Sequence, residues 1–318
     1  MQDATPAIEI RELRKLYGPR AAVDGLTLTV PRGSFFGFLG PNGAGKSTTI
    51  RMLTGLLPAD AGRATILGLD CWHNATTLRH RVGYVPEKPR FYDWMTVNEL
   101  GWFISGFHRA GFLSRYRELV ENFRLDLAAK LKNLSKGGYA KIGLALALAV
   151  DPEVLILDEP TSGLDLLTRR EFLSSMVDLA GEGRTILISS HQIAEVERVA
   201  SHIAIIDEGK LLINESMEEL KRKFLRVRLR YDGAPPDPIS LGTILERNGS
   251  GRVMQVLVRD PRPEGLDSLR VSANVFDLEE TPLTLEEIYA SLLARPLKPK
   301  REDEPAAEPA AAAEEAQS

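Results

Sequence analysis

Residues 34 to 50 read SFFGFLGPNGAGKSTTI, and this stretch decides the fold. An apolar segment typical of a buried parallel strand runs into a glycine-rich loop, and a helix is predicted from Lys46 to Leu57, just before Pro58. The loop, Gly40 to Ser47, fits the pattern G-x-x-x-x-G-K-[ST]. In such a loop, backbone N–H groups and the helix N-terminus surround a phosphate, the lysine reaches the β- and γ-phosphates, and the serine hydroxyl ligates Mg²⁺. The stretch therefore predicts a nucleoside triphosphate site between a strand and a helix.

The segments on either side of this loop predict an α/β chain. In chain order they are short strands (8–40), further strands (63–86), a helical stretch that opens with a capping box at Thr96 to Glu99 (96–132), a helix (141–150), a strand (153–158), a helix (165–180) and a strand (184–190). The alternation of helices and strands after residue 141 is typical of a parallel sheet.

The C-terminal part has a different character. RVRLRYD (226–232) and RVMQVLVRD (252–260) alternate between apolar and polar residues, and a second capping box, Thr284 to Glu287, opens a short helix to about Ala294. We expect 225–295 to form a small α+β accessory domain. The end, 296–318, is rich in proline, alanine and glutamate and is expected to be disordered.

Composition excludes several classes of protein. The net charge of −4 gives no support for a nucleic acid partner, and Cys71, the only cysteine, fits a reducing cytosol. The N-terminus lacks the basic and apolar regions of a signal peptide, and the longest apolar run, Leu144 to Val150, is far too short to span a bilayer. We therefore expect any membrane role to come from another subunit.

Two further strand ends carry polar residues. VLILDEP (154–160) ends in Asp158, which could hold Mg²⁺ through water, and Glu159, which could polarise an attacking water. Solvated acids at a strand-to-loop junction are the alternative. His191 follows the next strand, where a neutral imidazole could hydrogen-bond a γ-phosphate, although a lone histidine at a strand end is more often structural.

Leu134 to Lys141 read LSKGGYAK, with two adjacent glycines before an apolar run that should be helical. Inside a helix, glycine costs about 1 kcal/mol relative to alanine. At a helix start, however, glycines leave backbone N–H groups free to meet an anion. The segment therefore predicts a second anion-binding helix start.

The motifs occur in the order phosphate loop, Pro86-Glu87, LSKGGYAK, LDEPTSGLD and SSH. From residue 8 to about 222, this order and spacing resemble the nucleotide-binding subunits of ABC (ATP-binding cassette) transporters. The resemblance implies an α/β fold: a P-loop NTPase (RecA-like) core with an antiparallel β subdomain and a helical subdomain, followed by a small C-terminal α+β extension. The implied divisions are an ATP-binding domain (1–224), its helical subdomain (88–134), an accessory domain (225–295) and a disordered tail (296–318).

In that family LSKGGYAK corresponds to the signature motif, which serves the nucleotide of a second chain. Two copies pack head to tail, so that Ser135 and Gly137 of one copy face the γ-phosphate held by Lys46 of the other. The resemblance therefore implies a dimer of nucleotide-binding domains, expected to be a homodimer, that encloses ATP between its chains.

The resemblance also assigns roles to single residues. Glu159, His191 and Lys46 are the expected catalytic residues. Tyr17 is expected to stack on adenine, although a surface tyrosine would look the same in the sequence. Asp165 is expected to contact the opposite chain, with an ordinary helix N-cap as the alternative. The expected ATP-binding residues are Tyr17, Gly40, Pro41, Asn42, Gly43, Ala44, Gly45, Lys46, Ser47, Thr48, Glu87, Ser135, Gly137 and Asp165, and the expected Mg²⁺ ligands are Ser47, Glu87 and Asp158.

Three positions depart from the family pattern. Lys136 replaces the usual glycine of the signature, where it could add positive charge near the phosphates or be solvated, and Gly138 replaces the usual glutamine. Glu87 stands where glutamine usually links Mg²⁺ and the attacking water to the membrane partner. Because Gly137 is retained and glutamate can still bind metal or water, we expect an active variant of the site.

The chain carries one phosphate loop and one signature motif, so it is half of a working pair. Its segment 225–295 is similar to the C-terminal extension of the ATPases of ABC-2-type exporters, which serve a separate transmembrane permease. Six aromatic residues of 88–132 could mark the docking surface for that permease or could pack in the local core. They are Phe91, Tyr92, Trp94, Trp102, Phe103 and Phe107.

The expected function is an ATP-hydrolysing subunit that powers export, peripheral on the cytoplasmic face of the membrane, with ATP and Mg²⁺ as cofactors. One alternative is a soluble ABC ATPase that acts on ribosomes or DNA. Such proteins usually hold two cassettes or a long inserted coiled coil, and neither is visible in the sequence. A second alternative, a regulatory module without turnover, is disfavoured by Glu159 and His191.

Overall fold

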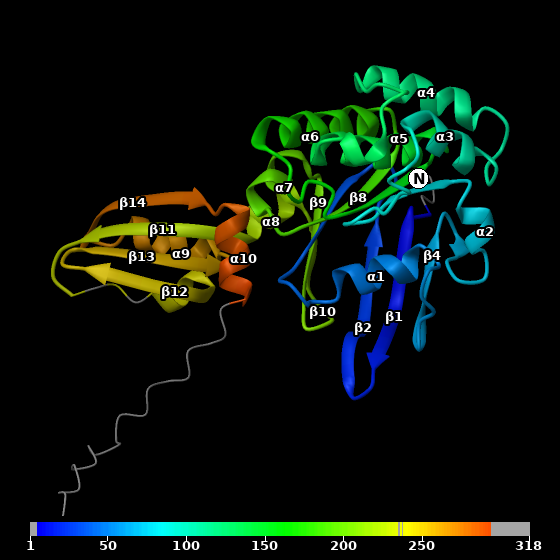
Figure 1. Ribbon diagram of the computed structural model, residues 1–318. Coiled ribbons are helices and arrows are strands. Elements are labelled where there is room, and N and C mark those ends of the chain that lie inside the picture. Colours follow the sequence, from blue (N-terminus) through cyan, green and yellow to red (C-terminus); the bar gives the residue numbers. More distant parts are fainter. Residues whose placement is uncertain (1–4, 235, 237, 294–318) are drawn as a thin grey trace, which may run out of the picture.

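A computed structural model describes residues 5–234, 236 and 238–293 (Figure 1). The tail expected to be disordered, 296–318, lies outside the described residues. No helix in the described part of the chain is long and apolar enough to cross a membrane.

A six-stranded sheet in the order β10-β9-β3-β8-β7-β6 organises the first part of the chain. All of its neighbouring strands are parallel except β10, which pairs antiparallel with β9. Its members are β3 (Phe35–Leu39), β6 (Val82–Val85), β7 (Val154–Asp158), β8 (Thr185–Ser190), β9 (His202–Asp207) and β10 (Lys210–Ser216). Every residue of β3, β7 and β8 is buried, as the continuous apolar runs of these strands predict for a parallel sheet covered on both faces.

A second, antiparallel sheet in the order β2-β1-β4-β5 covers one face of the first. Its strands are β1 (Ile8–Tyr17), β2 (Arg20–Val30), β4 (Ala61–Ile66) and β5 (Leu69–Asp70). Buried side chains of these strands share one apolar core with Ile50 of helix α1 (Lys46–Leu53) and with Ile156 and Leu187 of the central sheet. Helix α1 ends before the predicted Leu57, because Gly55 adopts a left-handed conformation (φ 67°) that turns the chain away.

The opposite face of the central sheet is covered by helices. They include α6 (Leu166–Gly181), α7 (Ile193–Val199) and α8 (Met217–Lys223), whereas the short α2 (Ala75–Leu78) precedes β6. Phe172 and Met176 of α6 and Val196 of α7 pack against strand residues such as Leu155 and Ile186. This arrangement, helices on one face and an antiparallel sheet on the other, confirms the expected α/β architecture.

The helical region consists of separate helices rather than the continuous stretch predicted over 96–132. It comprises α3 (Val97–Ser105), α4 (Phe112–Asn122), a short 3₁₀ turn (Leu131–Asn133) and α5 (Lys136–Ala149). The capping box at Thr96 and Glu99 is confirmed, but the chain breaks between Gly106 and Gly111, where Gly111 has φ 93°. Helix α5 begins five residues before the predicted residue 141, because the Ser135 side chain caps it.

The C-terminal part forms a third sheet in the order β12-β13-β11-β14. Its elements are β11 (Phe224–Tyr231), a 3₁₀ turn (Pro238–Leu241), β12 (Thr243–Ser250), β13 (Val253–Arg259), α9 (Pro263–Arg270), β14 (Val275–Pro282) and α10 (Leu285–Leu293). The capping box of Thr284 and Glu287 is present, whereas β12 and β14 were not predicted. Helix α10 joins this part to the ATP-binding part (Figure 1), since the Leu285 N–H donates to the carboxylate of Glu197 in α7 at 3.0 Å.

Close packing of β6 on α5 depends on Gly83. A Cβ atom at Gly83 would lie 2.6 Å from the backbone oxygen of Ala147 in α5, so we expect Gly83→Ala to lower the free energy of unfolding by about 1–3 kcal/mol. Gly143, on the α5 side of this interface, has room for a methyl group, with its nearest neighbour 3.7 Å away. Gly143→Ala should therefore stabilise the protein by up to about 1 kcal/mol. Urea unfolding of both variants checks the pair, and equal midpoints would contradict the packing described here.

Candidate functional site

The loop from Gly40 to Thr48 joins the end of β3 to the start of α1. Gly45 is the N-cap of α1 and has φ 106°, and a Cβ atom there would lie 2.4 Å from the backbone oxygen of Ala22. A Cβ atom at Gly40 would meet the backbone oxygen of Ile206 at the same distance. The two glycines are therefore required sterically, and they fold the loop tightly over the sheet edge.

Lys46 is buried beneath this loop, with only 6% of its surface exposed. Its ammonium group donates to the backbone oxygen of Gly40 (2.6 Å) and to that of Pro41 (3.3 Å), and lies 3.8 Å from Glu159 Oε1. Burial lowers the pKa of Lys46 from its ordinary value, while the carboxylates of Glu159, Asp158 and Glu87 oppose this shift. The site thus places a buried lysine, with carboxylates around it, where a phosphate would bind.

Asp158, the last residue of β7, is buried beside the loop. Its Oδ1 atom accepts a hydrogen bond from Ser189 Oγ at 2.7 Å and from Ser47 Oγ at 3.3 Å. Ser47 and Asp158 therefore offer adjacent oxygen donors at the mouth of the phosphate loop. This donor set suits Mg²⁺, which prefers oxygen ligands and commonly combines one or two carboxylates with phosphate and water.

Glu159 follows in a left-handed backbone conformation (φ 49°), which is uncommon for residues other than glycine. Its N–H donates to the hydroxyl (3.0 Å) and the backbone oxygen (3.2 Å) of Ser189, and these bonds hold the conformation in place. The side chain turns toward His191, whose Nδ1 lies 2.7 Å from Glu159 Oε2. The backbone N–H of His191 donates to the same Glu159 oxygen at 3.2 Å. A strained backbone that aims a carboxylate at a histidine is typical of a functional site.

These groups open into a cleft of about 610 Å³. The lining residues are Tyr17, Arg20, Ala22, Asn42, Gly43, Gly45, Lys46, Ser47, Thr48, Glu87, Glu159, Ser162 and His191. Most of the residues expected from the sequence are therefore gathered here, with half-exposed Tyr17 among them. Arg20 and Ala22 belong to no recognisable motif and so were not expected from the sequence. Ser189 was not expected either, because its only signal is its place two residues before His191.

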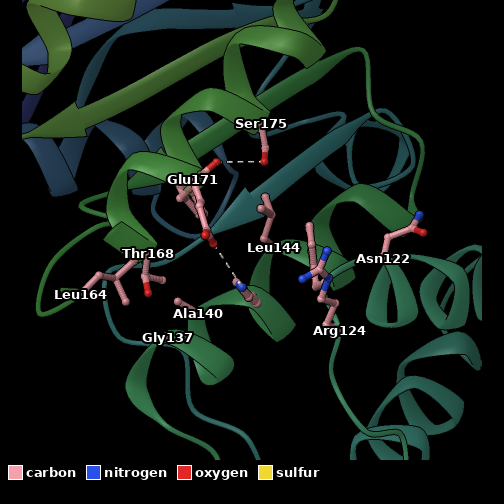
Figure 2. Close-up of a pocket in the computed structure, with 12 residues that line it drawn as sticks. Asn122, Arg124, Gly137, Ala140, Leu144, Leu164, Thr168, Glu171 and Ser175 are labelled. Carbon is pink, nitrogen blue, oxygen red and sulfur yellow. Dashed lines mark hydrogen bonds and ion pairs between the residues drawn. The ribbon is translucent and has the colours of Figure 1, made fainter. Parts of the chain in front are cut away.

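Six expected ATP-binding residues are not among those that line this cleft. Gly40, Pro41 and Ala44 still belong to the phosphate loop, whereas the other three lie elsewhere in the chain. Ser135 caps α5, its hydroxyl accepting the Gly138 N–H at 3.1 Å, and Gly137 lines a separate cavity of about 280 Å³ with Leu164 and Thr168 of the α6 region (Figure 2). Asp165 caps α6, accepting hydrogen bonds from the N–H groups of Leu167 and Thr168. Hydrogen bonds from Thr168 also keep the pKa of Asp165 below its usual range. Within one chain, Asp165 thus adopts the helix-cap arrangement that the sequence left as the alternative.

Comparison with known proteins gives consistent matches. Residues 23–162 match the family model described as ABC transporter. The chain is 33% identical to the daunorubicin/doxorubicin resistance ATP-binding protein DrrA of Streptomyces peucetius, over 96% of this chain and 97% of that protein. It is also 33% identical to the Nod factor export ATP-binding protein I of Ralstonia nicotianae, over 93% and 96% of the two chains. Among solved structures, an ATP-binding subunit of an ABC transporter superposes with a TM-score of 0.63 at 30% identity, over 69% of this chain and 92% of that one.

The buried cation of the cleft gives a direct test of the site. Replacing Lys46 by methionine removes charge-assisted hydrogen bonds, each of which contributes about 1.5–3 kcal/mol, so we expect the affinity for MgATP to fall at least about 10-fold. Lys210, an exposed lysine paired with Asp24, is the matched control, and Lys210→Met should leave the affinity unchanged. Isothermal titration calorimetry measures both, and equal affinities of the two variants would refute the assignment of Lys46.

Proposed function

Because the chain belongs to the ABC transporter family and is one of its ATP-binding, ATP-hydrolysing subunits, we propose that it powers export of a substrate through a separate membrane permease. The single observation that carries the catalytic part is the contact of Glu159 with both Lys46 and His191 at the phosphate loop. The export part is supported by the two full-length relatives, one named for drug resistance and the other for Nod factor export.

In the proposed mechanism, Lys46 and the backbone N–H groups of the loop bind the β- and γ-phosphates. Glu159 orients the attacking water and accepts its proton. His191, whose Nδ1 lies against the Glu159 carboxylate, holds that carboxylate toward the phosphate and faces the γ-phosphate with its other ring nitrogen. Ser47, Asp158 and Glu87 would hold Mg²⁺, which neutralises charge on the phosphate oxygens when bound.

The proposed working unit is a head-to-tail dimer. Ser135 and Gly137 lie at the start of a helix outside their own chain's cleft, where backbone N–H groups and the helix dipole favour an anion. A second copy, placed so that this helix start closes over its Lys46, would supply that anion as a γ-phosphate. We expect two identical chains to enclose two ATP molecules in this way.

The helical region, 88–134 of the ATP-binding domain (1–224), is the proposed docking surface for the permease. Tyr92, Trp94, Trp102, Phe103 and Phe107 are exposed. All of these except Trp102 form a chain of ring contacts, with centroids of Tyr92–Trp94, Tyr92–Phe103 and Phe103–Phe107 5.7–6.0 Å apart. Phe91 differs from them, since it packs on Tyr139 within the local core. An exposed aromatic patch of this kind is typical of a protein interface.

A groove of about 410 Å³ beside these aromatics supports the same proposal. Its lining includes Ile104, Phe107 and His108 of the helical region together with His80 and Tyr84. The Nδ1 atom of His108 is buried and has no hydrogen-bond partner among the described residues. A docked segment cannot reach this buried atom, so the groove supports docking through its exposed lining residue Phe107.

The remaining parts of the proposal follow from the assembly. A subunit docked on the helical region would be peripheral on the cytoplasmic face, where ATP is available. The accessory domain, 225–295, would stay outside the catalytic cleft. Of the two relatives described above, one is named for export and the other for drug resistance, so a soluble ABC ATPase that acts on ribosomes or DNA is not favoured.

Glu159→Gln tests the proposed base. The amide keeps the shape of the side chain but cannot accept the proton, so we expect ATP turnover to fall by about 100-fold or more while ATP still binds. The variant should also elute as a dimer in ATP during size-exclusion chromatography. Glu118→Gln, an exposed change on α4, is the control for phosphate release. Unchanged turnover in Glu159→Gln would show that another group is the base.

A second experiment tests docking. The double variant Trp102→Ala, Phe107→Ala removes two side chains that are 67% and 68% exposed, so its fold and ATP affinity should be preserved. We expect several-fold less of it to be recovered with a polytopic membrane protein from detergent-solubilised membranes of its own host. Phe276→Ala, in the accessory domain, removes an aromatic side chain of similar exposure (64%) and serves as the control. Equal recovery of both variants would place the docking surface elsewhere.

A further inference from the structure

The first turn of α6 lies against the signature helix α5, the loop Ser162–Asp165 and the start of α7. Leu166 and Leu167 point into solvent and are 73% and 72% exposed. The next residue, Thr168, faces the signature helix: a Cβ atom at Gly137 would approach Thr168 Cγ2 to 3.1 Å (Figure 2). Arg169 points the other way, toward α7. Successive helical residues are about 100° apart, so one turn can present a different side chain to each neighbour.

Arg169 makes three hydrogen-bonded contacts. One amino group, Nη2, donates to the backbone oxygen of Leu164 at 3.0 Å, within the loop Ser162–Asp165. The other, Nη1, donates to Glu195 Oε1 at 2.9 Å and to the side-chain oxygen of Gln192. The planar guanidinium thereby joins the loop before α6 to the start of α7.

The start of α7 is directly attached to the catalytic histidine. Gln192 is the N-cap residue of α7 and the next residue after His191, whose ring lies 2.7 Å from the Glu159 carboxylate. Arg169 therefore contacts the residue next to His191, and His191 orients the carboxylate of the proposed base, Glu159. A displacement of about 1 Å at such a group can cost about 100-fold in rate.

Stability alone explains this cluster poorly. Arg169 Nε and Glu195 Oε2 are both buried without a hydrogen-bond partner among the residues that the structure describes. A buried ion pair with unsatisfied atoms contributes little to stability and is often replaceable by apolar side chains. The cluster instead fixes the position of one segment relative to another.

We propose that Arg169 is a positioning residue for ATP hydrolysis: it ties the loop Ser162–Asp165 to α7 and so sets the place of His191 against Glu159. Through Thr168 and Gly137 the same helical turn also contacts the signature motif. When a second copy binds, a displacement of the signature motif or of the exposed Leu166 and Leu167 would thus alter the position of the Glu159 carboxylate in the same chain. This inference rests on the proposed roles of Glu159 and His191.

The test is a double-mutant cycle on the full-length chain, measured by steady-state phosphate release. Arg169→Met should lower kcat about 10-fold or more and change the Kd for ATP by less than about 2-fold, because the phosphate loop is untouched. In a His191→Ala background the same change should lower kcat by less than about 2-fold, since Arg169 acts through His191. Arg170→Met, at the exposed neighbouring arginine, should leave kcat at the parent value.

The outcomes separate this inference from the proposed function. If Arg169→Met lowers kcat equally in the parent and His191→Ala backgrounds, or has no effect, the positioning role is wrong although the function stands. If the parent releases no phosphate, the proposed function fails and the inference fails with it. If His191→Ala equals the parent, the proposed role of His191 is wrong, and the inference fails while ATP hydrolysis stands. Should Arg169→Met not fold, the cycle is repeated with Arg169→Lys, which cannot make all three contacts at once and should show the same dependence on His191 with a smaller loss.

Discussion

The catalytic cleft depends on the register of three parallel strands. Leu39 of β3 pairs with Ser190 of β8, and Ser189 of β8 pairs with Asp158 of β7, so the three strands end at one edge of the sheet. The chain that leaves each strand there carries the phosphate loop, the acidic pair or the histidine. Because side chains alternate between faces, a shift of one residue in either pairing would turn one of these groups away from the others. Close packing of both faces of the sheet makes such a shift costly, since each of these strands is fully buried.

Within this edge, charge is balanced locally. The buried ammonium of Lys46 has carboxylates on one side and backbone oxygens of its own loop on the other. The loop already has this shape without a ligand. A bound phosphate would replace some of the Lys46 contacts with contacts to its own oxygens. This preorganisation lowers the cost of ordering the site at the moment of binding.

Much of the fold and of the cleft was predictable because both depend on local patterns. The G-x-x-x-x-G-K-S loop, the apolar strand before Asp158 and the capping box at Thr96 are short-range signals, and the structure agrees with them. The end of α1 and the start of α5 were missed by a few residues, since the left-handed Gly55 and the Ser135 cap are decided by backbone geometry. Contacts between distant segments, such as Ser189 with Asp158 or Arg169 with Glu195, leave no pattern in one sequence. The distinction between exposed Trp102 and half-buried Phe91 likewise needed the packed helices.

In the proposed head-to-tail dimer, the position of Ser135 and Gly137 outside their own chain's cleft has a genetic consequence. Each chain then contributes its signature segment to the nucleotide site of the partner chain, and its own site is completed by the partner's signature segment. A copy with a damaged signature segment would keep its own phosphate loop intact yet disable the pocket of a healthy mate. Such an allele, expressed together with the normal one, would be dominant-negative rather than a recessive loss of function.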